Sequence, residues 1–270
     1  MTAMGHVLSI CLIFKLKMQE KRGEIIMKKR VGLLLAVVLG IASLTGCGKS
    51  ASDELVMATN AAFPPYEYVE GDGYAGIDVE IAEAIAAELG MKLRIEDVEF
   101  GAIIAGVQSG KYNMGMAGMT VTEERLNSVN FSDTYAVGVQ SIIVKEGSDI
   151  KSVDDLSSDC KIGVQQDTTG DIYATDDYGE AAVTRFKTGA DAVQALLTGK
   201  LDCVIIDNEP AKAYVEKNNG LTILDTAYCE EEYAICVSKK NEELLGKIND
   251  ALGKLKADGT IDGIVGKYIQ

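Results

Sequence analysis

The chain has 270 residues, of which 47% are apolar and 25% charged, as is typical of a soluble globular protein with one large domain or two lobes. Its formal charge is −15, but the first 47 residues hold seven basic and two acidic residues, so the remainder carries −20. A body this acidic repels phosphate backbones, which argues against a nucleic-acid partner. The only histidine is His6, which excludes Ser-His-Asp and Cys-His catalysis and histidine-ligated metal sites from the rest of the chain.

Residues 27–46 have the composition of an export signal. A basic patch at residues 28–30 precedes an apolar run of 14 residues, which is shorter than the roughly 20 residues of a membrane span. The following Leu44-Thr45-Gly46-Cys47 resembles the bacterial lipobox, which implies that Cys47 is diacylated and becomes the first residue of the mature protein. An ordinary secretory cleavage near Gly46 is the alternative. Residues 47–53 would then form a short flexible tether.

Residues 1–26 fit no part of this signal. Lys21-Arg22-Gly23-Glu24 can be translated from a purine-rich ribosome-binding sequence just upstream of Met27. We therefore expect translation to start at Met27, and residues 1–26 to be a mis-assigned upstream extension. Peptides from residues 2–20 of the purified protein would contradict this expectation.

Four cysteines follow Cys47. Two of them, Cys203 and Cys236, sit in apolar, strand-like runs and are predicted to be buried thiols. A disulfide between Cys229 and Cys236 is compatible with an extracytoplasmic location, and the sequence leaves it open. No Cys-x-x-Cys spacing indicates zinc, so neither a metal nor another cofactor is predicted.

From residue 54 onward, predicted strands and helices alternate, which indicates an α/β fold with crossover connections. Apolar or alternating runs predict strands at residues 54–60, 92–98, 112–116, 141–144, 161–165, 182–186, 201–206, 221–224 and 233–237. Apolar residues at helical spacing predict helices at residues 78–89, 100–108, 190–197, 208–215 and 242–256, with a last helix that ends at Tyr268. No transmembrane segment is predicted after residue 46.

Two segments of similar sequence favour a two-lobed organisation. Residues 101–114 and residues 190–203 each combine a helix, a Gly-Lys turn and a buried strand. Ligands of open α/β sheets bind outside the carboxyl ends of the strands. Two lobes of similar plan would therefore expose their strand ends to a common cleft.

The strand at residues 112–116 leads into a candidate carboxylate site. The small residues Ala117 and Gly118 let a ligand approach the backbone closely, and Thr120 adds a hydroxyl. Arg125 follows on the first turn of a short helix, and its guanidinium fork matches a carboxylate. The alternative is a surface arginine paired with a neighbouring glutamate on a solvated helix.

Seven motifs, in this order, resemble the polar-amino-acid solute-binding proteins of ABC importers. They are Phe63-Pro-Pro-Tyr-Glu-Tyr, Gly76-Ile-Asp-Val-Glu-Ile-Ala, Ala117-Gly-Met-Thr-Val-Thr-Glu-Glu-Arg, Asn130-Phe-Ser-Asp-Thr-Tyr, Gly163-Val-Gln-Gln-Asp-Thr-Thr-Gly, Ile206-Asp and Asp258-Gly-Thr. The resemblance covers residues 53–269 and implies the α/β, two-lobed type II periplasmic-binding-protein fold, in which each lobe is a mixed sheet flanked by helices. It implies one lobe of residues 54–137 and 232–270, a second lobe of residues 138–231, and crossings near residues 137–139 and 231–233.

The resemblance also implies how an amino acid would be held. Arg125 should bind the α-carboxylate, helped by the backbone near Gly118, the hydroxyl of Thr120 and the backbone near Thr169. Asp207 should accept the α-ammonium, because a zwitterion in a partly desolvated cleft needs one fixed cation and one fixed anion. The complete set of expected ligand-binding residues is Asn60, Phe63, Phe100, Ala117, Gly118, Thr120, Arg125, Gln165, Thr169 and Asp207.

Some of these residues have structural alternatives. The side chain of Asp207 can cap the helix at residues 208–215, and Thr168 or Thr169 can cap the helix that follows it. The resemblance places Phe63 and Phe100 on the two faces of the ligand side chain, whereas phenylalanine more often lies in the core.

The amides favour a polar, neutral ligand such as glutamine. Asn60 stands where many members that bind basic amino acids carry an acidic residue, and Gln165 and Gln166 add two more amides. Arginine, lysine and cystine remain open.

The resemblance implies a monomeric, non-enzymatic protein outside the cytoplasm. The lipid on Cys47 would hold it at the outer face of the cell membrane, where it would deliver its ligand to an ABC transporter permease. A binding protein that reports to a receptor, and a secreted enzyme similar to cyclohexadienyl dehydratase, are the alternative functions.

Overall fold

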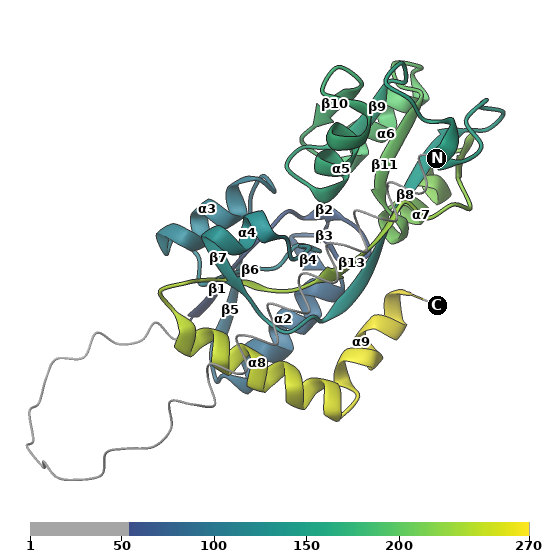
Figure 1. Cartoon of the computed structure of the whole chain (residues 1–270). Coiled ribbons are helices and arrows are strands. Elements are labelled where there is room, and N and C mark those ends of the chain that lie inside the picture. Colours follow the sequence, from purple (N-terminus) through teal and green to yellow (C-terminus); the bar gives the residue numbers. More distant parts are fainter. Residues whose placement is uncertain (1–53, 270) are drawn as a thin grey trace, which may run out of the picture. The chain divides into compact units, whose positions relative to one another are not determined.

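A computed structural model describes residues 54–269 (Figure 1). The predictions for residues 1–26, for the signal at residues 27–46, for lipidation of Cys47 and for the tether at residues 47–53 lie outside the described residues. Between residues 54 and 269, no helix combines the length and the apolar composition needed to cross a membrane.

A five-stranded sheet has the strand order β5-β1-β6-β14-β7. Its strands are β1 (Glu54–Thr59), β5 (Lys92–Asp97), β6 (Met114–Gly115), β7 (Val129–Phe131) and β14 (Cys236–Ser238). Strand β1 runs parallel to β5 and β6, whereas β14 runs antiparallel to β6 and β7. The β1 side chains alternate between two separate apolar clusters, because this strand is covered on both faces.

Helices cover both faces of this sheet (Figure 1). They are α2 (Ile77–Glu88), α3 (Ala102–Ser109), α4 (Glu123–Ser128), α8 (Glu242–Ala257) and α9 (Thr260–Tyr268). Leu55 and Met57 of β1 share a cluster with residues of α2 and α8, whereas Val56 and Ala58 share one with Ile103 of α3 and its neighbours. A small antiparallel sheet of β2 (Ala62–Phe63), β3 (Glu67–Glu70) and β4 (Gly73–Ala75) follows β1 in the chain.

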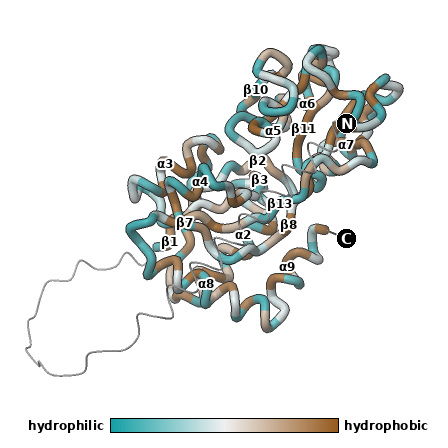
Figure 2. Tube along the Cα trace, in the orientation of Figure 1, coloured by the Kyte–Doolittle hydropathy of each residue, from teal (hydrophilic) through white to brown (hydrophobic). Residues whose placement is uncertain are grey.

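A second, six-stranded sheet has the order β10-β9-β11-β8-β12, with β13 also paired to β8. Its strands are β8 (Ala136–Lys145), β9 (Ile162–Gln165), β10 (Val183–Phe186), β11 (Cys203–Asp207), β12 (Leu221–Ile223) and β13 (Cys229–Tyr233). The helical elements of this part are η1 (Val153–Asp155), α5 (Thr169–Tyr178), α6 (Gly189–Leu197) and α7 (Asn208–Lys217). Figure 2 shows β11 as a brown, hydrophobic stretch, which agrees with the burial of all five of its residues. The two-lobed α/β fold expected from the sequence is confirmed.

The two predicted crossings lie side by side. Strand β13 runs antiparallel to the first half of β8, and its register pairs Glu230 with Val139, Glu231 with Gly138 and Glu232 with Val137. The exact residues at which one lobe ends and the other begins remain a prediction.

The predicted strand at residues 233–237 is wrong, because the chain changes sheets within it. Tyr233 ends β13 in the second sheet, and Cys236 begins β14 in the first. Cys236 is a fully buried free thiol, as is Cys203, so the Cys229–Cys236 disulfide that the sequence left open does not form.

Candidate ligand-binding site

One cavity gathers all ten residues that the sequence proposed for ligand binding. Its volume is about 20 Å³, and its walls also include Glu67 and Thr168. Asn60 follows the carboxyl end of β1, and Gly118 follows β6, whereas Gln165 and Asp207 end β9 and β11 of the other sheet. The strand ends of both lobes therefore face the same space, as in other open α/β sheets.

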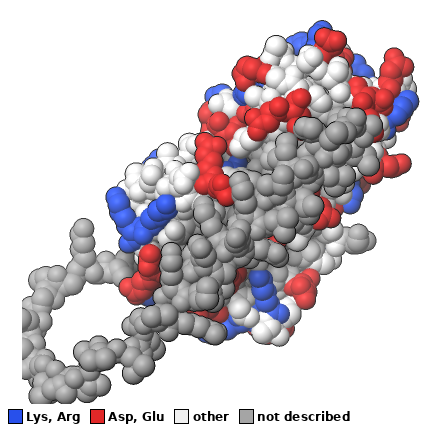
Figure 3. Space-filling view, viewed as in Figure 1, with Lys and Arg blue, Asp and Glu red and all other residues white. Residues whose placement is uncertain are grey.

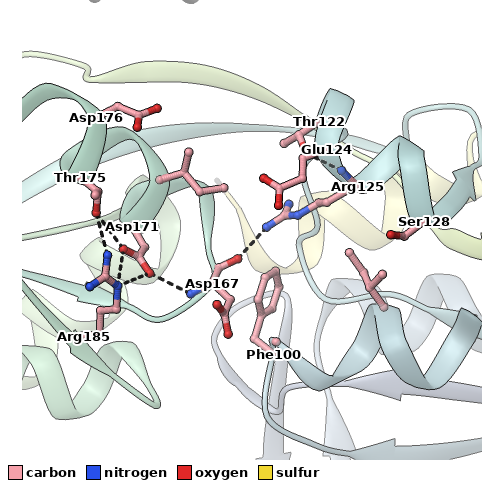
Figure 4. A pocket seen from close by; sticks show the side chains of 13 residues that line it. Phe100, Thr122, Glu124, Arg125, Ser128, Asp167, Asp171, Thr175, Asp176 and Arg185 are labelled. Atoms are coloured by element: carbon pink, nitrogen blue, oxygen red, sulfur yellow. Dashed lines mark hydrogen bonds and ion pairs between the residues drawn. The ribbon is translucent and has the colours of Figure 1, made fainter. Parts of the chain in front are cut away.

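Arg125 is a buried cation with few partners. The α4 helix fixes its position, because Thr122 caps the helix by accepting the Arg125 N–H at 3.1 Å. Its Nη1 donates to the carbonyl of Thr120 at 2.8 Å, and its Nη2 donates to the carbonyl of Asp167 at 3.0 Å (Figure 4). The guanidinium also lies 5.3 Å from the centre of the Phe100 ring, a cation–π distance.

No ion pair neutralises Arg125 among the residues that the structure describes. Burial lowers the pKa of Arg125, and the more distant carboxylate of Glu231 acts against this shift. The alternative of a surface arginine paired with a neighbouring glutamate is therefore wrong, since Arg125 is only 7% exposed. A buried guanidinium of this kind suits an anionic ligand group.

A larger, open cleft lies beside the cavity. It has a volume of about 520 Å³ and shares Phe100 and Arg125 with the cavity (Figure 4). The side chain of Arg125 therefore contributes to the walls of both spaces.

Asp207 is a buried carboxyl group at the end of β11. Its Oδ2 accepts a hydrogen bond from Gln140 Nε2 at 2.7 Å, and its Oδ1 accepts one from the Tyr233 hydroxyl. Burial raises the pKa of Asp207, and the neighbouring carboxylate of Glu231 raises it further. The side chain makes no capping bond to α7, so the alternative role as a helix cap is wrong.

Two donors expected at the ligand carboxylate have partners within the protein. The N–H of Gly118 donates to Asp78 Oδ2 at 2.8 Å, and the hydroxyl of Thr120 donates to Glu231 Oε2 at 3.1 Å. The expected help from these two groups at the carboxylate is therefore not available in this arrangement.

The amino end of α5 supplies donors in their place. Thr168 caps α5 by accepting the N–H of Asp171 at 3.4 Å, which assigns the cap to Thr168. Thr169 begins the helix, lines the cavity and is 3% exposed. The first turn of a ten-residue helix presents N–H groups and a positive dipole end, both of which favour an anion.

The amides that the sequence assigned to the ligand side chain bind each other. Gln165 Nε2 donates to Asn60 Oδ1 at 2.8 Å, and Asn60 Nδ2 donates to the carbonyl of Val98 at 2.8 Å. Gln166 is exposed and contacts Asp167. The two phenylalanines have different surroundings. The Phe63 ring stacks on the Tyr66 ring at a centroid distance of 5.8 Å and is 8% exposed, whereas Phe100 also lines the open cleft.

Glu67 is the site residue that sequence reasoning missed. It is 1% exposed, and its Oε2 is the one buried side-chain atom of the cavity wall without a hydrogen-bond partner in the described chain. Burial and the adjacent Asp78 raise its pKa well above the ordinary value, while burial raises the pKa of Asp78 to about 6. Only its place between two tyrosines in an otherwise apolar run could have signalled a buried carboxyl.

These buried acids do not assemble a metal site. Within residues 54–269, no group of three or more potential ligand side chains is arranged to hold a metal ion.

Comparison with known proteins identifies the family. Residues 55–270 match the family described as bacterial extracellular solute-binding proteins, family 3. The arginine-binding extracellular protein ArtP of Bacillus subtilis (strain 168) is 33% identical over 254 residues, which cover 90% of this chain and 98% of ArtP.

Solved structures have the same fold. An ancestral arginine-binding protein bound to glutamine is 41% identical, with a TM-score of 0.76 over 80% of this chain and 98% of that chain. AncCDT-1, an ancestral amino acid-binding protein described as a precursor of cyclohexadienyl dehydratase, is 32% identical, with a TM-score of 0.75 over 81% and 96% of the two chains. The resemblance found in the motifs is thus confirmed, and the chain belongs to the bacterial extracellular solute-binding proteins, family 3.

Proposed function

We propose that this protein captures one amino acid between its two lobes and delivers it to the permease of an ABC importer. The observation that carries this proposal is the pairing of Arg125 and Asp207. A buried guanidinium on α4, without an ion pair in residues 54–269, and a buried carboxyl group at the end of β11 line the same cavity. A zwitterion supplies the counter-charge to both.

Capture requires the lobes to move. The cavity of about 20 Å³ has room for about one water molecule, far less than an amino acid needs. The lobes meet through hydrogen bonds from Arg125 to Asp167, from Gln165 to Asn60 and from Tyr214 to Ala62. An amino acid would enter an open form, and its contacts to both lobes would shift the population toward a closed form.

The hydrogen-bonding groups of the cavity favour a ligand side chain that donates. Asn60 and Gln165 are engaged with each other, so the earlier basis for a neutral ligand is gone. The remaining unpartnered side-chain atom of the cavity wall is the Oε2 of Glu67, which accepts a hydrogen bond from a cation when the carboxyl is ionised. Glu67 and Asp78 form an acidic pair. We therefore propose a basic side chain, and the similarity to ArtP supports arginine.

The charge of the whole body supports the same choice. Residues 54–269 carry a formal charge of −20, and Figure 3 shows red acidic side chains, interspersed with blue basic ones, on the coloured part of the face. A negative potential of this size attracts cations at long range.

Arginine and citrulline provide the sharpest test, because they differ mainly in the charge of the terminal group. Isothermal titration calorimetry on residues 54–270 should show L-arginine binding at least about tenfold tighter than L-citrulline, the scale of a charge-assisted hydrogen bond. The substitution Glu67→Gln should reduce this preference. The matched control is Glu70→Gln, on the exposed end of the same strand, which should leave it unchanged. Tighter binding of citrulline or L-glutamine by the wild type would contradict the choice of a basic ligand, and no binding of any amino acid would contradict the function.

The family description indicates an extracellular location, and the mode of attachment is part of the proposal. The proposal places the mature protein, a monomer, at the outer face of the membrane through two acyl chains on Cys47, because two chains give stable attachment where one is marginal. Metabolic labelling with palmitate, compared between the wild type and Cys47→Ser, tests the lipid.

One observation favours a second candidate function. A dehydratase needs an acid beside the bound carboxylate, and Glu67 is a cavity-lining acid with a raised pKa. Incubation with arogenate or prephenate should give no aromatic product if the protein only binds its ligand.

A further inference from the structure

Glu231 is a buried carboxylate that does not line the cavity. It lies on β13, is 4% exposed and stands opposite Gly138 of β8, at one of the two crossings. Its position on a connecting strand does not by itself explain why a charged group is buried there, since burying a charge is costly unless hydrogen bonds compensate.

The contacts of Glu231 connect it to both lobes. Its Oε2 accepts a hydrogen bond from the Thr120 hydroxyl at 3.1 Å and another from Gln140 Nε2 at 3.0 Å. The same Gln140 Nε2 donates to Asp207 Oδ2 at 2.7 Å. Thr120, which follows β6, and Asp207, which ends β11, are therefore linked through the Glu231 carboxylate and the Gln140 amide.

This arrangement fixes the direction of the Thr120 hydroxyl. Glu231 Oε2 accepts hydrogen bonds from both the Gln140 amide and the Thr120 hydroxyl, so the hydroxyl hydrogen is directed at this carboxylate. A hydroxyl has one hydrogen and two lone pairs. With its hydrogen directed at Glu231, Thr120 presents only lone pairs to the cavity.

Asp207 is oriented in the same way. Gln140 Nε2 and the Tyr233 hydroxyl each donate to one of its carboxylate oxygens, which fixes the plane of the carboxylate. Its remaining lone pairs can face the cavity. Two acceptors directed at one space suit a group that has only donors, such as an ammonium.

We propose that Glu231 is a positioning residue for the ammonium subsite. It fixes Thr120 as an acceptor and, through Gln140, holds Asp207, so that both receive the α-ammonium of the ligand. The inference rests on the proposed capture of an amino acid, and it moves Thr120 from the carboxylate end of the ligand to the ammonium end.

The test compares an amino acid with its analogue that lacks the ammonium. The probes are L-arginine and 5-guanidinopentanoate, titrated into residues 54–270 by calorimetry; if the wild type prefers L-glutamine, the probes are L-glutamine and glutaramic acid. Glu231→Met removes the acceptor and keeps most of the volume. This substitution should weaken the binding of the amino acid by about 10- to 100-fold, which is the scale of hydrogen bonds to a charged group. It should weaken the binding of the analogue by less than about twofold.

Two further variants separate positioning from a merely structural role. Glu231→Gln keeps an oxygen that can accept from Thr120, so it should bind the amino acid several-fold more tightly than Glu231→Met. Glu232→Met is the matched control, because the neighbouring side chain accepts from Thr134 instead and should leave both probes unaffected.

Three outcomes would overturn the inference: wild-type affinity in Glu231→Met, an equal loss for both probes, or the same loss in Glu232→Met. Should Glu231→Met fail to fold by circular dichroism, Glu231→Leu, which also lacks an acceptor, replaces it, and an unchanged ratio of the two affinities would overturn the inference. The wild type is titrated before any variant. If it binds no amino acid, that separate result refutes the proposed function itself.

Discussion

The sharpest mutational prediction concerns Arg125. Arg125→Ala removes the buried guanidinium together with its hydrogen bonds to the carbonyls of Thr120 and Asp167. A ligand carboxylate would then lie unpaired in a partly desolvated cavity, at a cost of about 2–5 kcal/mol, or about 30- to 5000-fold in affinity. Arg125→Lys keeps the charge but not the planar fork, so we expect an intermediate loss of about 10- to 100-fold.

The loss should appear in binding far more than in folding. Removing a buried cation that forms no ion pair within residues 54–269 relieves a desolvation cost, which offsets the two lost hydrogen bonds. Calorimetric titration with L-arginine measures the ligand affinity, and thermal unfolding without ligand measures the stability of the fold. The control is Arg94→Ala, since Arg94 is half-exposed and its ion pairs contribute little. Wild-type affinity in Arg125→Ala would refute the assignment of the carboxylate to Arg125.

Three further outcomes are expected. Asp78 and Asp207 have raised pKa values, so the folded state holds protons that the unfolded chain has lost above about pH 4. The free energy of unfolding should therefore fall as pH rises from about 5 to 8. A thermal midpoint that rises across this interval would contradict this prediction. A ligand ammonium favours ionised Asp207, so affinity should increase with pH toward the pKa of Asp207, and Asp207→Asn should remove this trend in dissociation constants measured from pH 5 to 8. Gly118→Ala would place a methyl 2.8 Å from the Phe63 ring and should destabilise the fold by about 1–3 kcal/mol in urea unfolding, more than the control Gly147→Ala, which also has a positive φ but lies in open space.

The sequence predicted the elements whose own residues determine their structure. Strands such as β9 and β11 are continuous apolar runs, and α8 has apolar residues at helical spacing between an Asn241 cap and a polar end. The missed elements depend on distant partners. Strand β13 contains three consecutive glutamates, which disfavour strands, and it forms because β8 supplies a ladder.

The residues of the candidate site also fall into two groups, those that the sequence identified and those that only the structure shows. Arg125 was identified because it follows a strand end and stands on the first turn of a helix, whereas the role of Asp207 came from the resemblance to the family. Glu67 and Glu231 were missed, because their importance depends on which groups surround them in three dimensions. The expected role of Asn60 and Gln165 was affected for the same reason, since only the folded chain shows that the two amides bind each other across the lobes.

The paired crossings limit how the two lobes can move. Because β8 and β13 are joined by a ladder from Ala136–Tyr233 to Gln140–Cys229, the two connections share one set of backbone hydrogen bonds. Sliding one lobe past the other along the strands would break that ladder, whereas twisting or bending the two-stranded β8–β13 pair preserves it. If the lobes close as proposed, the connection would therefore remove translational freedom and leave rotation, so that each closure would bring Arg125 and Asp207 to the same separation.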